Sequence, residues 1–307
     1  MRIAIIGAGG VGGYFGARLA AAGEQVTFIA RGAQLDAMRK DGLRVISPLG
    51  DLAVHPVRAE SDPATVGPVD LVLVAVKLWD TEAALHAARP LVGSATGVIS
   101  LQNGVDAVDA LTRSFGKAAV LGGVAHIAAV IEQPGVIRHT GTIARLTFGE
   151  LDGSTSARAA TFLAACRRAR IEAFLSADIR QAIWEKFVFL VAVSGMTTLI
   201  RLGIGPIRSD PVTRAMLGEA MQEVAAVASS TGIVLPDDTV DRLMQFCDSL
   251  PPGMVSSMLG DLQRGNRLEL EWLAGAVVRM GAELGVSTPV NRAIYGGLKL
   301  YADGKPG

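Results

Sequence analysis

The chain has 307 residues, of which half are hydrophobic and 19% are charged, so it is long enough for two domains and is not a disordered protein. Its 29 Lys and Arg balance its 29 Asp and Glu, which gives no sign of a nucleic-acid or membrane-surface partner. The two cysteines, Cys166 and Cys247, have no C-x-x-C spacing and are expected to be free buried thiols in a reducing cytoplasm. The four histidines are scattered, so no metal site is predicted.

The first half of the chain alternates strand-like and helix-like segments. We expect strands at 2–6, 25–30, 71–76, 98–101 and 120–122, with a helix at 13–22. Segments 43–46 and 52–57 read as a small antiparallel pair, and segments 136–139 and 144–149 read as a later hairpin. This alternation predicts an α/β domain with a doubly wound parallel sheet of Rossmann type over residues 1–177.

The second half of the chain, residues 178–307, reads as an all-α domain. Helices are expected at 179–200, 211–231, 237–250, 269–284 and 289–301, and prolines near two of the helix starts support this. Residues 304–307 are expected to form a frayed tail. The longest apolar run, 187–193, is far shorter than the roughly 20 residues of a membrane span, so no membrane partner is predicted.

A G-x-G-x-x-G fingerprint lies directly after the first strand and opens the first helix, which is the context that dinucleotide binding requires. The first glycine permits the tight turn, the second lets the backbone approach a pyrophosphate, and the third lets the helix pack on the strand. The cofactor-binding residues predicted here are Gly7, Ala8, Gly9, Gly10, Val11 and Gly12. The alternative is a glycine-rich turn without a ligand.

The strand ends indicate which cofactor is bound. The second strand ends at Arg31 with no acidic residue to bind a ribose 2′-hydroxyl, and arginine suits a 2′-phosphate, so NADP(H) is predicted over NAD(H). Lys77 and Asn103 follow two further strands and are expected at the cofactor crevice. The alternatives are a solvated loop arginine at Arg31 and a plain turn at Asn103.

Six segments together resemble the ketopantoate reductase (2-dehydropantoate 2-reductase) family over nearly the whole chain. They are IGAGGVGGY at 6–14, VKLW at 76–79, LQNGV at 101–105, PGVIRHTG at 134–141, IWEKF at 183–187, and SSMLGD at 256–261 followed by Glu269. The resemblance implies hydride delivery from NADPH to the keto carbon of a small-molecule 2-oxo acid. It also implies that Lys186 is the general acid, that Glu269 binds substrate or holds the lysine, and that Asn103 and Ser257 position the substrate.

The chemistry of the residues agrees with these roles, because a proton donor at the carbonyl oxygen stabilises the alkoxide that hydride transfer creates. Lys186 lies in an apolar helix, where desolvation lowers the pKa of a lysine. The alternative is a lysine whose stem lies along the helix edge and whose ammonium reaches water. For Glu269, the rival acid is Glu271, and both carboxylates would be exposed at a helix start if neither is functional.

The chain departs from the family pattern at two positions. The lysine helix of the family usually carries asparagines four and eight residues after the lysine, where this chain has Leu190 and Ser194. Both positions share the face of Lys186, and leucine cannot hydrogen-bond a substrate hydroxyl. Ketopantoate is therefore the first substrate hypothesis, and a less polar 2-oxo acid is the second.

Two further alternatives are a different dehydrogenase of the same architecture, such as a 3-hydroxyacid type, and a sensor that binds NADPH without turnover. The segment at 256–261 argues against the first, and the presence of both Lys186 and Glu269 argues against the second. The apolar helices of the second half are compatible with a homodimer interface or with a core alone.

Overall fold

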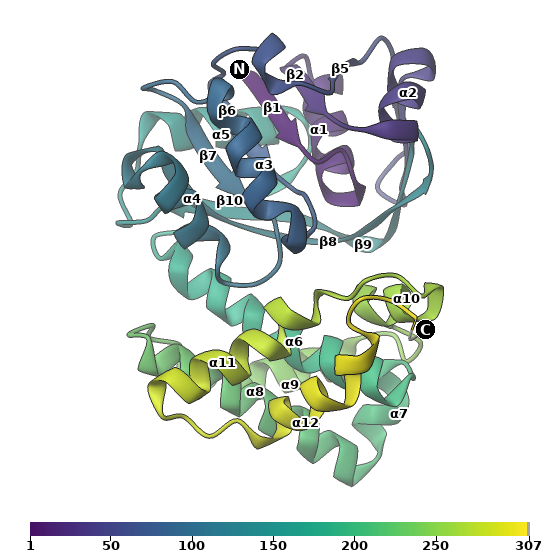
Figure 1. Ribbon diagram of the computed structural model, residues 1–307, viewed down its shortest axis with the longest axis vertical. Helices are drawn as coiled ribbons and strands as arrows, with labels where there is room; N and C mark the ends of the chain where they lie inside the picture. The colour runs from purple at the N-terminus through teal and green to yellow at the C-terminus, as the bar shows by residue number, and fades with distance from the viewer. Residues whose placement is uncertain (306–307) are drawn as a thin grey trace. The chain divides into compact units, whose positions relative to one another are not determined.

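The computed structural model describes residues 1–305 and divides into two compact units, Met1–Ala182 and Ile183–Gly307 (Figure 1). The first unit is built on a sheet and the second is mostly helical, which confirms the predicted fold class. The division falls inside one helix, slightly after the boundary at residues 177 and 178 expected from the sequence.

One ten-stranded sheet forms the N-terminal unit, in the order β4-β3-β9-β8-β7-β6-β1-β2-β5, with β10 beside β9. The strands from β8 to β5 in this order are parallel. The carboxyl ends of these strands lie along one side of the sheet. The strand order changes direction between β1 and β6, and sheets of this type bind ligands at the carboxyl ends beside such a point. The strands are β1 Arg2–Ile6, β2 Gln25–Ile29, β3 Leu43–Ile46, β4 Leu52–Val54, β5 Arg58–Glu60, β6 Leu71–Val74, β7 Gly97–Ser100, β8 Val120–Gln133, β9 Val136–Glu150 and β10 Glu172–Leu175.

Part of the sheet is antiparallel, as the expected strand pair and hairpin implied, but one of the two antiparallel pairings differs from the expected one. The strand expected at 120–122 is the long strand β8, which pairs antiparallel with β9 across the turn at Pro134 and Gly135. The hairpin expected between 136–139 and 144–149 is wrong, because both segments belong to the single strand β9. The register shifts beside Ile127, so that the residues from 141 to 143 bulge out of the ladder, and this bulge resembles a turn in the sequence. The antiparallel pairing of β3 and β4 is confirmed.

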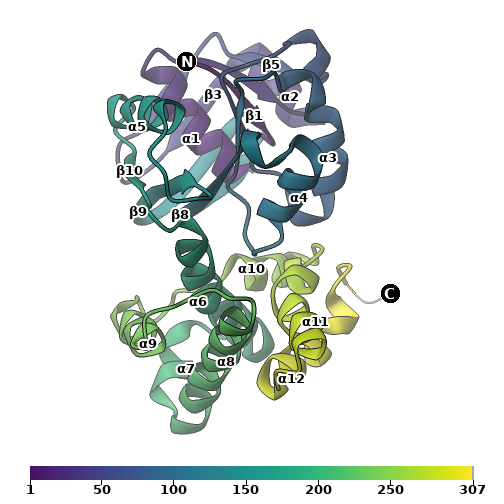
Figure 2. The same ribbon diagram turned by 90° about the vertical axis from the view of Figure 1, so that its left-hand side faces the viewer.

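Helices cover both faces of the sheet, with α1 and α5 on one face and α3 and α4 on the other (Figure 2). Large apolar side chains, among them Phe15, Phe28, Phe148 and Phe162, fill the layer between the sheet and the pair α1 and α5. The sequence analysis expected only the first of these helices. They are α1 Gly10–Ala21, α2 Gly32–Asp41, α3 Thr81–Ala88, α4 Ala107–Phe115 and α5 Ala157–Arg168, with short 3-10 turns at Pro63–Thr65, Leu78–Asp80, Arg89–Leu91 and Lys117–Ala119.

The C-terminal unit is a helical bundle in which most of the expected helices are confirmed. The expected helix at 269–284 is instead a 3-10 turn, Glu269–Trp272, and a separate helix, because the backbone of Leu273 leaves the helical region. The sequence analysis did not expect α7 or α10. The helices are α6 Ile179–Ile200, α7 Ile204–Ser209, α8 Pro211–Ser230, α9 Thr239–Ser249, α10 Ser257–Arg264, α11 Ala274–Leu284 and α12 Pro289–Leu298, followed by a 3-10 turn at Lys299–Tyr301.

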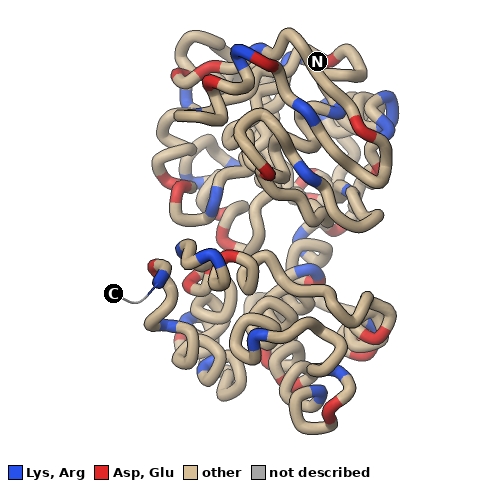
Figure 3. Tube along the Cα trace, turned by 90° about the vertical axis from the view of Figure 1, so that its right-hand side faces the viewer, with Lys and Arg blue, Asp and Glu red and all other residues tan. Residues whose placement is uncertain are grey.

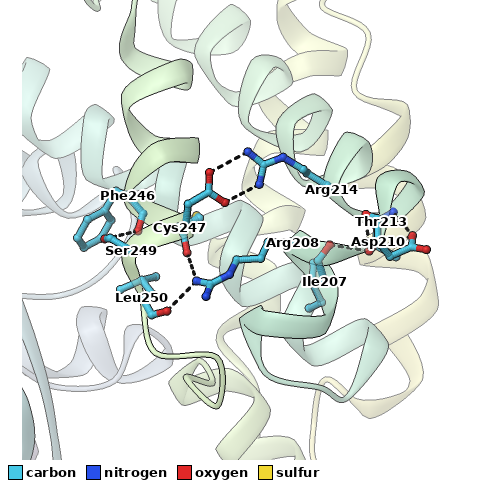
Figure 4. A network of polar contacts seen from close by, with 10 residues as sticks. Ile207, Arg208, Asp210, Thr213, Arg214, Phe246, Cys247, Ser249 and Leu250 are labelled. Atoms are coloured by element: carbon cyan, nitrogen blue, oxygen red, sulfur yellow. Dashed lines mark hydrogen bonds and ion pairs between the residues drawn. The ribbon is translucent and has the colours of Figure 1, made fainter.

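Arginines join α7, α8 and α9 into one packed group (Figure 4). Arg208 donates to the carbonyl oxygens of Cys247 and Leu250 at 2.6 and 2.7 Å, where α9 ends. Arg214 binds both carboxylate oxygens of Asp248 at 2.6 and 2.9 Å. The capping of carbonyl groups at a helix end by a cation stabilises α9 in place.

The cysteines are buried as expected, whereas residue 304 is more ordered than expected. Cys166 and Cys247 are free and buried, as expected, and burial raises the pKa of both thiols to about 12. In the expected tail 304–307, Gly304 is buried and its N–H group donates to the carbonyl oxygen of Tyr301 at 3.0 Å. That part is therefore ordered, and residues 306 and 307 lie outside the described residues.

The helix α6, which has the bounds that the sequence analysis expected, is the one helix of the described residues that is long and apolar enough to cross a membrane. In the structure, 61% of its most apolar window is buried, as in the core helix of a globular protein. Acidic and basic residues are interspersed along the chain trace (Figure 3), in keeping with the balanced net charge.

Candidate active site

The glycine-rich turn between β1 and α1 is tightly enclosed on all but one side. Gly7 has a φ of +96°, which disfavours any other residue, and a Cβ added to it would lie 2.8 Å from the backbone nitrogen of Val76. A Cβ on Gly10 would lie 2.0 Å from the carbonyl oxygen of Ala129, and one on Gly12 would lie 2.1 Å from that of Gly7. These glycines are therefore required for packing.

Gly9 is different, because a Cβ added there would meet no atom within 4 Å. Gly9 is the N-cap of α1, with no side-chain cap and no acidic residue in the first turn. The N–H group of Gly13 donates to the carbonyl oxygen of Gly9 at 2.7 Å, which is the first hydrogen bond of the helix. The N–H groups before it therefore have no acceptor within the helix. Open space in front of unused N–H groups at a helix N-terminus suits a pyrophosphate.

A side chain of α2 also holds the glycine-rich turn in place. The Gln34 side chain, on α2, donates to the carbonyl oxygen of Ala8 at 2.9 Å and accepts from the N–H group of Gly135 at 2.9 Å. Arg31 lies at the N-cap of the same helix, two residues after the end of β2, and is exposed. Its side chain forms no hydrogen bond or ion pair with the other described residues, so its guanidinium is available to an anion.

Lys77 and Asn103 lie at the same edge of the sheet as the glycine-rich turn. Each follows one of two neighbouring parallel strands, β6 and β7, which pair through Val74 and Ser100. Lys77 is exposed, with its ammonium 5.6 Å from the centre of the Trp79 ring, and Asn103 is half-buried. The structure therefore brings the predicted cofactor-binding residues to one edge of the N-terminal unit.

Lys186 is half-buried on α6 in the C-terminal unit, beside the buried aromatic residues Trp184 and Phe187. Burial lowers the pKa of its ammonium to about 8, and the negative charge of Glu269 opposes this shift in part. The neighbouring Glu185 is engaged elsewhere, because it pairs with Arg242 of α9 at 2.8 Å. A lysine with a pKa of about 8 can give up a proton near neutral pH.

The choice between Glu269 and Glu271 can be made from their contacts. The carboxylate of Glu271 accepts hydrogen bonds from the hydroxyl of Tyr295 at 2.8 and 3.0 Å and also binds the ammonium of Lys299. It therefore joins the 3-10 turn to α12. Glu269 is 7% exposed and is the acid that acts electrostatically on Lys186. The engagement of Glu271 by other residues and the charge effect of Glu269 on the pKa of Lys186 both favour Glu269 as the partner of the lysine.

The face of α6 that carries Lys186 continues into a line of buried hydroxyls. Leu190 is half-buried and Ser194 is 1% exposed. Further along, the hydroxyl of Thr197 donates at 2.9 Å to that of Ser256. Ser256 also accepts from the N–H group of Leu259 at 3.1 Å as the N-cap of α10. Ser257 is the next residue and is exposed at the start of that helix. The helix ends at Arg264, with Gly265 as its C-cap, so the segment from Ser257 to Glu269 is not one straight helix. The sequence had left this question open.

His139, in the segment PGVIRHTG, has a structural role and does not lie with the residues at the strand ends. Its Nε2 donates to the carbonyl oxygen of Ile143 at 3.0 Å, so its Nδ1 accepts the hydroxyl hydrogen of Ser47 at 2.8 Å. Burial lowers the pKa of the imidazole, the hydrogen bond to Ile143 opposes this, and the charge of Arg18 adds to it. The histidine ties the β3–β4 pair to the bulge of β9.

The sequence analysis did not single out Gln102, a neighbour of Asn103 whose half-buried side chain forms several hydrogen bonds. The position of a polar residue in a loop does not show whether its side chain is engaged in this way. No group of three or more His, Cys, Asp or Glu residues in the described part of the chain could hold a metal ion, and the absence of a metal stays a prediction.

Comparison with known proteins decides the family. The family model described as ketopantoate reductase PanE/ApbA matches residues 3–153, and that of the ketopantoate reductase PanE/ApbA C terminal matches residues 178–302. The chain belongs to the ketopantoate reductase family. It is therefore an oxidoreductase, and this family is NADPH-dependent.

Relatives of the family match along their whole lengths. The chain is 34% identical to a 2-dehydropantoate 2-reductase of Archaeoglobus fulgidus, with 95% of each chain covered. It is 33% identical to one of Mesorhizobium japonicum, with 96% of this chain and 95% of the relative covered. Among solved structures, a PanE/ApbA family ketopantoate reductase of Ralstonia eutropha is 33% identical, with a TM-score of 0.90 and 98% of both chains covered.

Proposed function

We propose that the protein reduces a 2-oxo acid to the 2-hydroxy acid with NADPH, and that ketopantoate, which becomes pantoate, is the substrate. The observation that carries the proposal is Lys186, a lysine with a pKa lowered to about 8 that lies in the electrostatic reach of the buried Glu269. The chain belongs to the ketopantoate reductase family, and Lys186 lies in the segment 183–187 that resembles the family's lysine helix, while Glu269 follows the segment 256–261 that resembles its second signature. These resemblances support the roles of proton donor and partner.

The N-terminal unit offers residues that fit the cofactor. The open space at Gly9 and the N–H groups that begin α1 would hold the pyrophosphate, and Arg31 would bind the 2′-phosphate. Lys77 and Asn103 would bind the part of the cofactor that reaches the strand ends. When bound, NADPH supplies a hydride for the keto carbon of the substrate.

The C-terminal unit supplies the proton. The ammonium of Lys186 would donate a hydrogen bond to the keto oxygen and then a proton, as negative charge develops on that oxygen. The carboxylate of Glu269 favours the charged form of the lysine and so keeps the proton available at neutral pH. Lys186 ends the step neutral and takes a proton from water before the next turnover. Asn103, Ser194 and Ser257 would position the substrate.

The residues that follow Lys186 on α6 bear on the choice of substrate. Leu190 presents an apolar side chain one turn after Lys186, where family members usually carry an asparagine, and this favours a second candidate, a less polar 2-oxo acid. A pocket that offers no partner to a substrate hydroxyl loses discrimination for it. Ser194, one turn further, keeps a buried hydroxyl on the same face of α6.

Both candidates are tested by measuring the oxidation of NADPH, as the loss of its absorbance. The substrates are ketopantoate and a series of 2-oxo acids of increasing apolar size. Efficient turnover of ketopantoate would support the first candidate. If a less polar acid is preferred, then Leu190→Asn should move the preference towards ketopantoate, whereas Leu202→Asn, at an exposed leucine after α6, should not. NADPH binding without turnover of any of these acids would contradict the proposal and support a sensor.

Three further expectations accompany this function. A cytoplasmic location, the absence of nucleic-acid and membrane partners, and a homodimer remain predictions. The small-molecule substrate agrees with the relatives, which are enzymes of small-molecule metabolism.

A further inference from the structure

The side chain of Gln102 extends the pairing of β6 and β7 beyond the point where both strands end. The last backbone bond of the pair joins the N–H group of Leu101 to the carbonyl oxygen of Val74 at 2.8 Å. Beyond it, the Gln102 amide nitrogen donates to the carbonyl oxygen of Val76 at 3.0 Å, so a side chain takes the place of the next backbone bond.

The same amide nitrogen also donates to the hydroxyl of Thr81, at 2.8 Å, and that hydroxyl donates to the carbonyl oxygen of Leu78 at 2.7 Å. The Gln102 side-chain oxygen accepts from the hydroxyl of Ser100 at 3.0 Å. One half-buried amide therefore has both its donor and its acceptor side engaged, across the segment from Val76 to Thr81 and the end of β7.

Two proposed functional residues are the direct neighbours of this network. Lys77 follows Val76, whose carbonyl Gln102 binds, and Asn103 follows Gln102 itself. A movement of the Gln102 side chain would change the spacing between the two segments that carry them. Displacements of about 1 Å in groups that hold reactants can cost on the order of a hundredfold in rate.

We propose that Gln102 is a positioning residue. It acts through Lys77 and Asn103 and so fixes the positions of the cofactor and the 2-oxo acid relative to each other. This inference rests on the proposed function. It assigns to Gln102 no contact with either reactant.

The test compares Gln102→Leu, which keeps the bulk and loses every side-chain hydrogen bond, with Thr96→Val. Thr96 is the matched control because its hydroxyl joins the amino ends of the same two strands, through the carbonyl oxygen of Val69 at 2.6 Å and the N–H group of Gly93 at 2.9 Å. Gln102→Glu is a second variant, which keeps the acceptor for Ser100 and removes the donor to Val76, in case the leucine variant does not fold.

We expect Gln102→Leu and Gln102→Glu to lower kcat/KM about tenfold to a hundredfold and to weaken NADPH binding measured by fluorescence. Thr96→Val should lower the melting temperature and leave both quantities close to those of the wild type. In an Asn103→Ala background, Gln102→Leu should cost less in kcat than in the wild type, because one of the two residues through which it acts is already absent.

The proposal is overturned if the Gln102 variants lose stability as Thr96→Val does but keep kcat/KM and NADPH affinity. It is also overturned if the effects of Gln102→Leu and Asn103→Ala on kcat simply multiply. If the wild type binds NADPH and reduces no 2-oxo acid, the proposed function has failed, whereas the loss of NADPH affinity in Gln102→Leu still decides whether Gln102 positions Lys77.

Discussion

Glu269 raises the pKa of Lys186 through its negative charge, while burial has the larger and opposite effect and brings that pKa down to about 8. The two influences act on one ammonium group from within the C-terminal unit. Their balance leaves the lysine mostly protonated at neutral pH, yet able to release its proton to a developing alkoxide.

The rate of reduction should therefore depend on pH in a defined direction. Lys186 must be protonated to donate, so kcat should be level below its pKa and should fall about tenfold per pH unit above pH 8. Glu269→Gln removes the charge that raises the pKa, and the break in the profile should move to lower pH. Glu271→Gln is the control, since that carboxylate is bound by Tyr295 and Lys299. A break that stays in place in Glu269→Gln, or moves equally in both variants, would contradict the electrostatic link.

Substitutions at two adjacent glycines should separate binding from packing. Gly9→Ala places a methyl group in open space, so it should fold normally and weaken NADPH binding by obstructing the pyrophosphate. Gly10→Ala brings the methyl group against the carbonyl oxygen of Ala129, so it should lower the free energy of unfolding by roughly 1–3 kcal/mol. Calorimetric NADPH titration and chemical denaturation measure the two effects. Unchanged NADPH affinity in a folded Gly9→Ala variant would remove the phosphate site from this turn.

Arg31 should determine the preference for the phosphorylated cofactor. Arg31→Ala is expected to weaken NADPH binding by about 1.5–3 kcal/mol, the range for a hydrogen bond to a charged group, and to change NADH binding little. Arg39→Ala serves as a control for general charge, because Arg39 belongs to α2 as well but pairs with Glu60 at 2.9 Å. Dissociation constants for both cofactors give the answer. Equal losses for NADPH and NADH would show that Arg31 does not bind the 2′-phosphate.

His139 should make stability depend on pH. Because its pKa is lower in the folded chain than the ordinary value of 6.5, the unfolded chain binds more protons in the range between the two values. Stability should thus be fully present above about pH 6.5 and should decline as the pH falls towards the lowered pKa. Denaturant unfolding of the wild type and of His139→Gln at pH values on either side of 6.5 checks this. A wild-type decline that persists unchanged in the variant would assign it to other groups.

The arrangement of the strands could be predicted from the sequence where the pattern is continuous. The buried run of β6 and the apolar segment of β1 mark their strands, and the glycines between β1 and α1 mark the turn. The pairing of β8 with β9 could not be predicted, because a strand that continues through a bulge has the same local composition as two strands and a turn. Short amphipathic helices such as α4 were missed for a similar reason, since eight or nine residues give a weak periodic signal.

The candidate site shows the same division. The glycines could be chosen from the sequence, because the strand and the helix beside them fix their local structure, whereas Lys186 was chosen from the resemblance to the family. The choice between Glu269 and Glu271 depended on Tyr295 and Lys299, which lie far along the chain, and only the packing of α12 shows that they occupy one of the two acids. Long-range contacts of this kind leave no mark on local spacing.

The most direct test of the central claim is the turnover of Lys186→Ala with NADPH and a 2-oxo acid that the wild type reduces. The variant should fold, bind NADPH with unchanged affinity and lose about 10²–10⁴-fold in kcat, since it lacks the proton donor. Identification of the wild-type product as the 2-hydroxy acid completes the measurement. A variant that turns over at the wild-type rate would show that Lys186 is not the general acid.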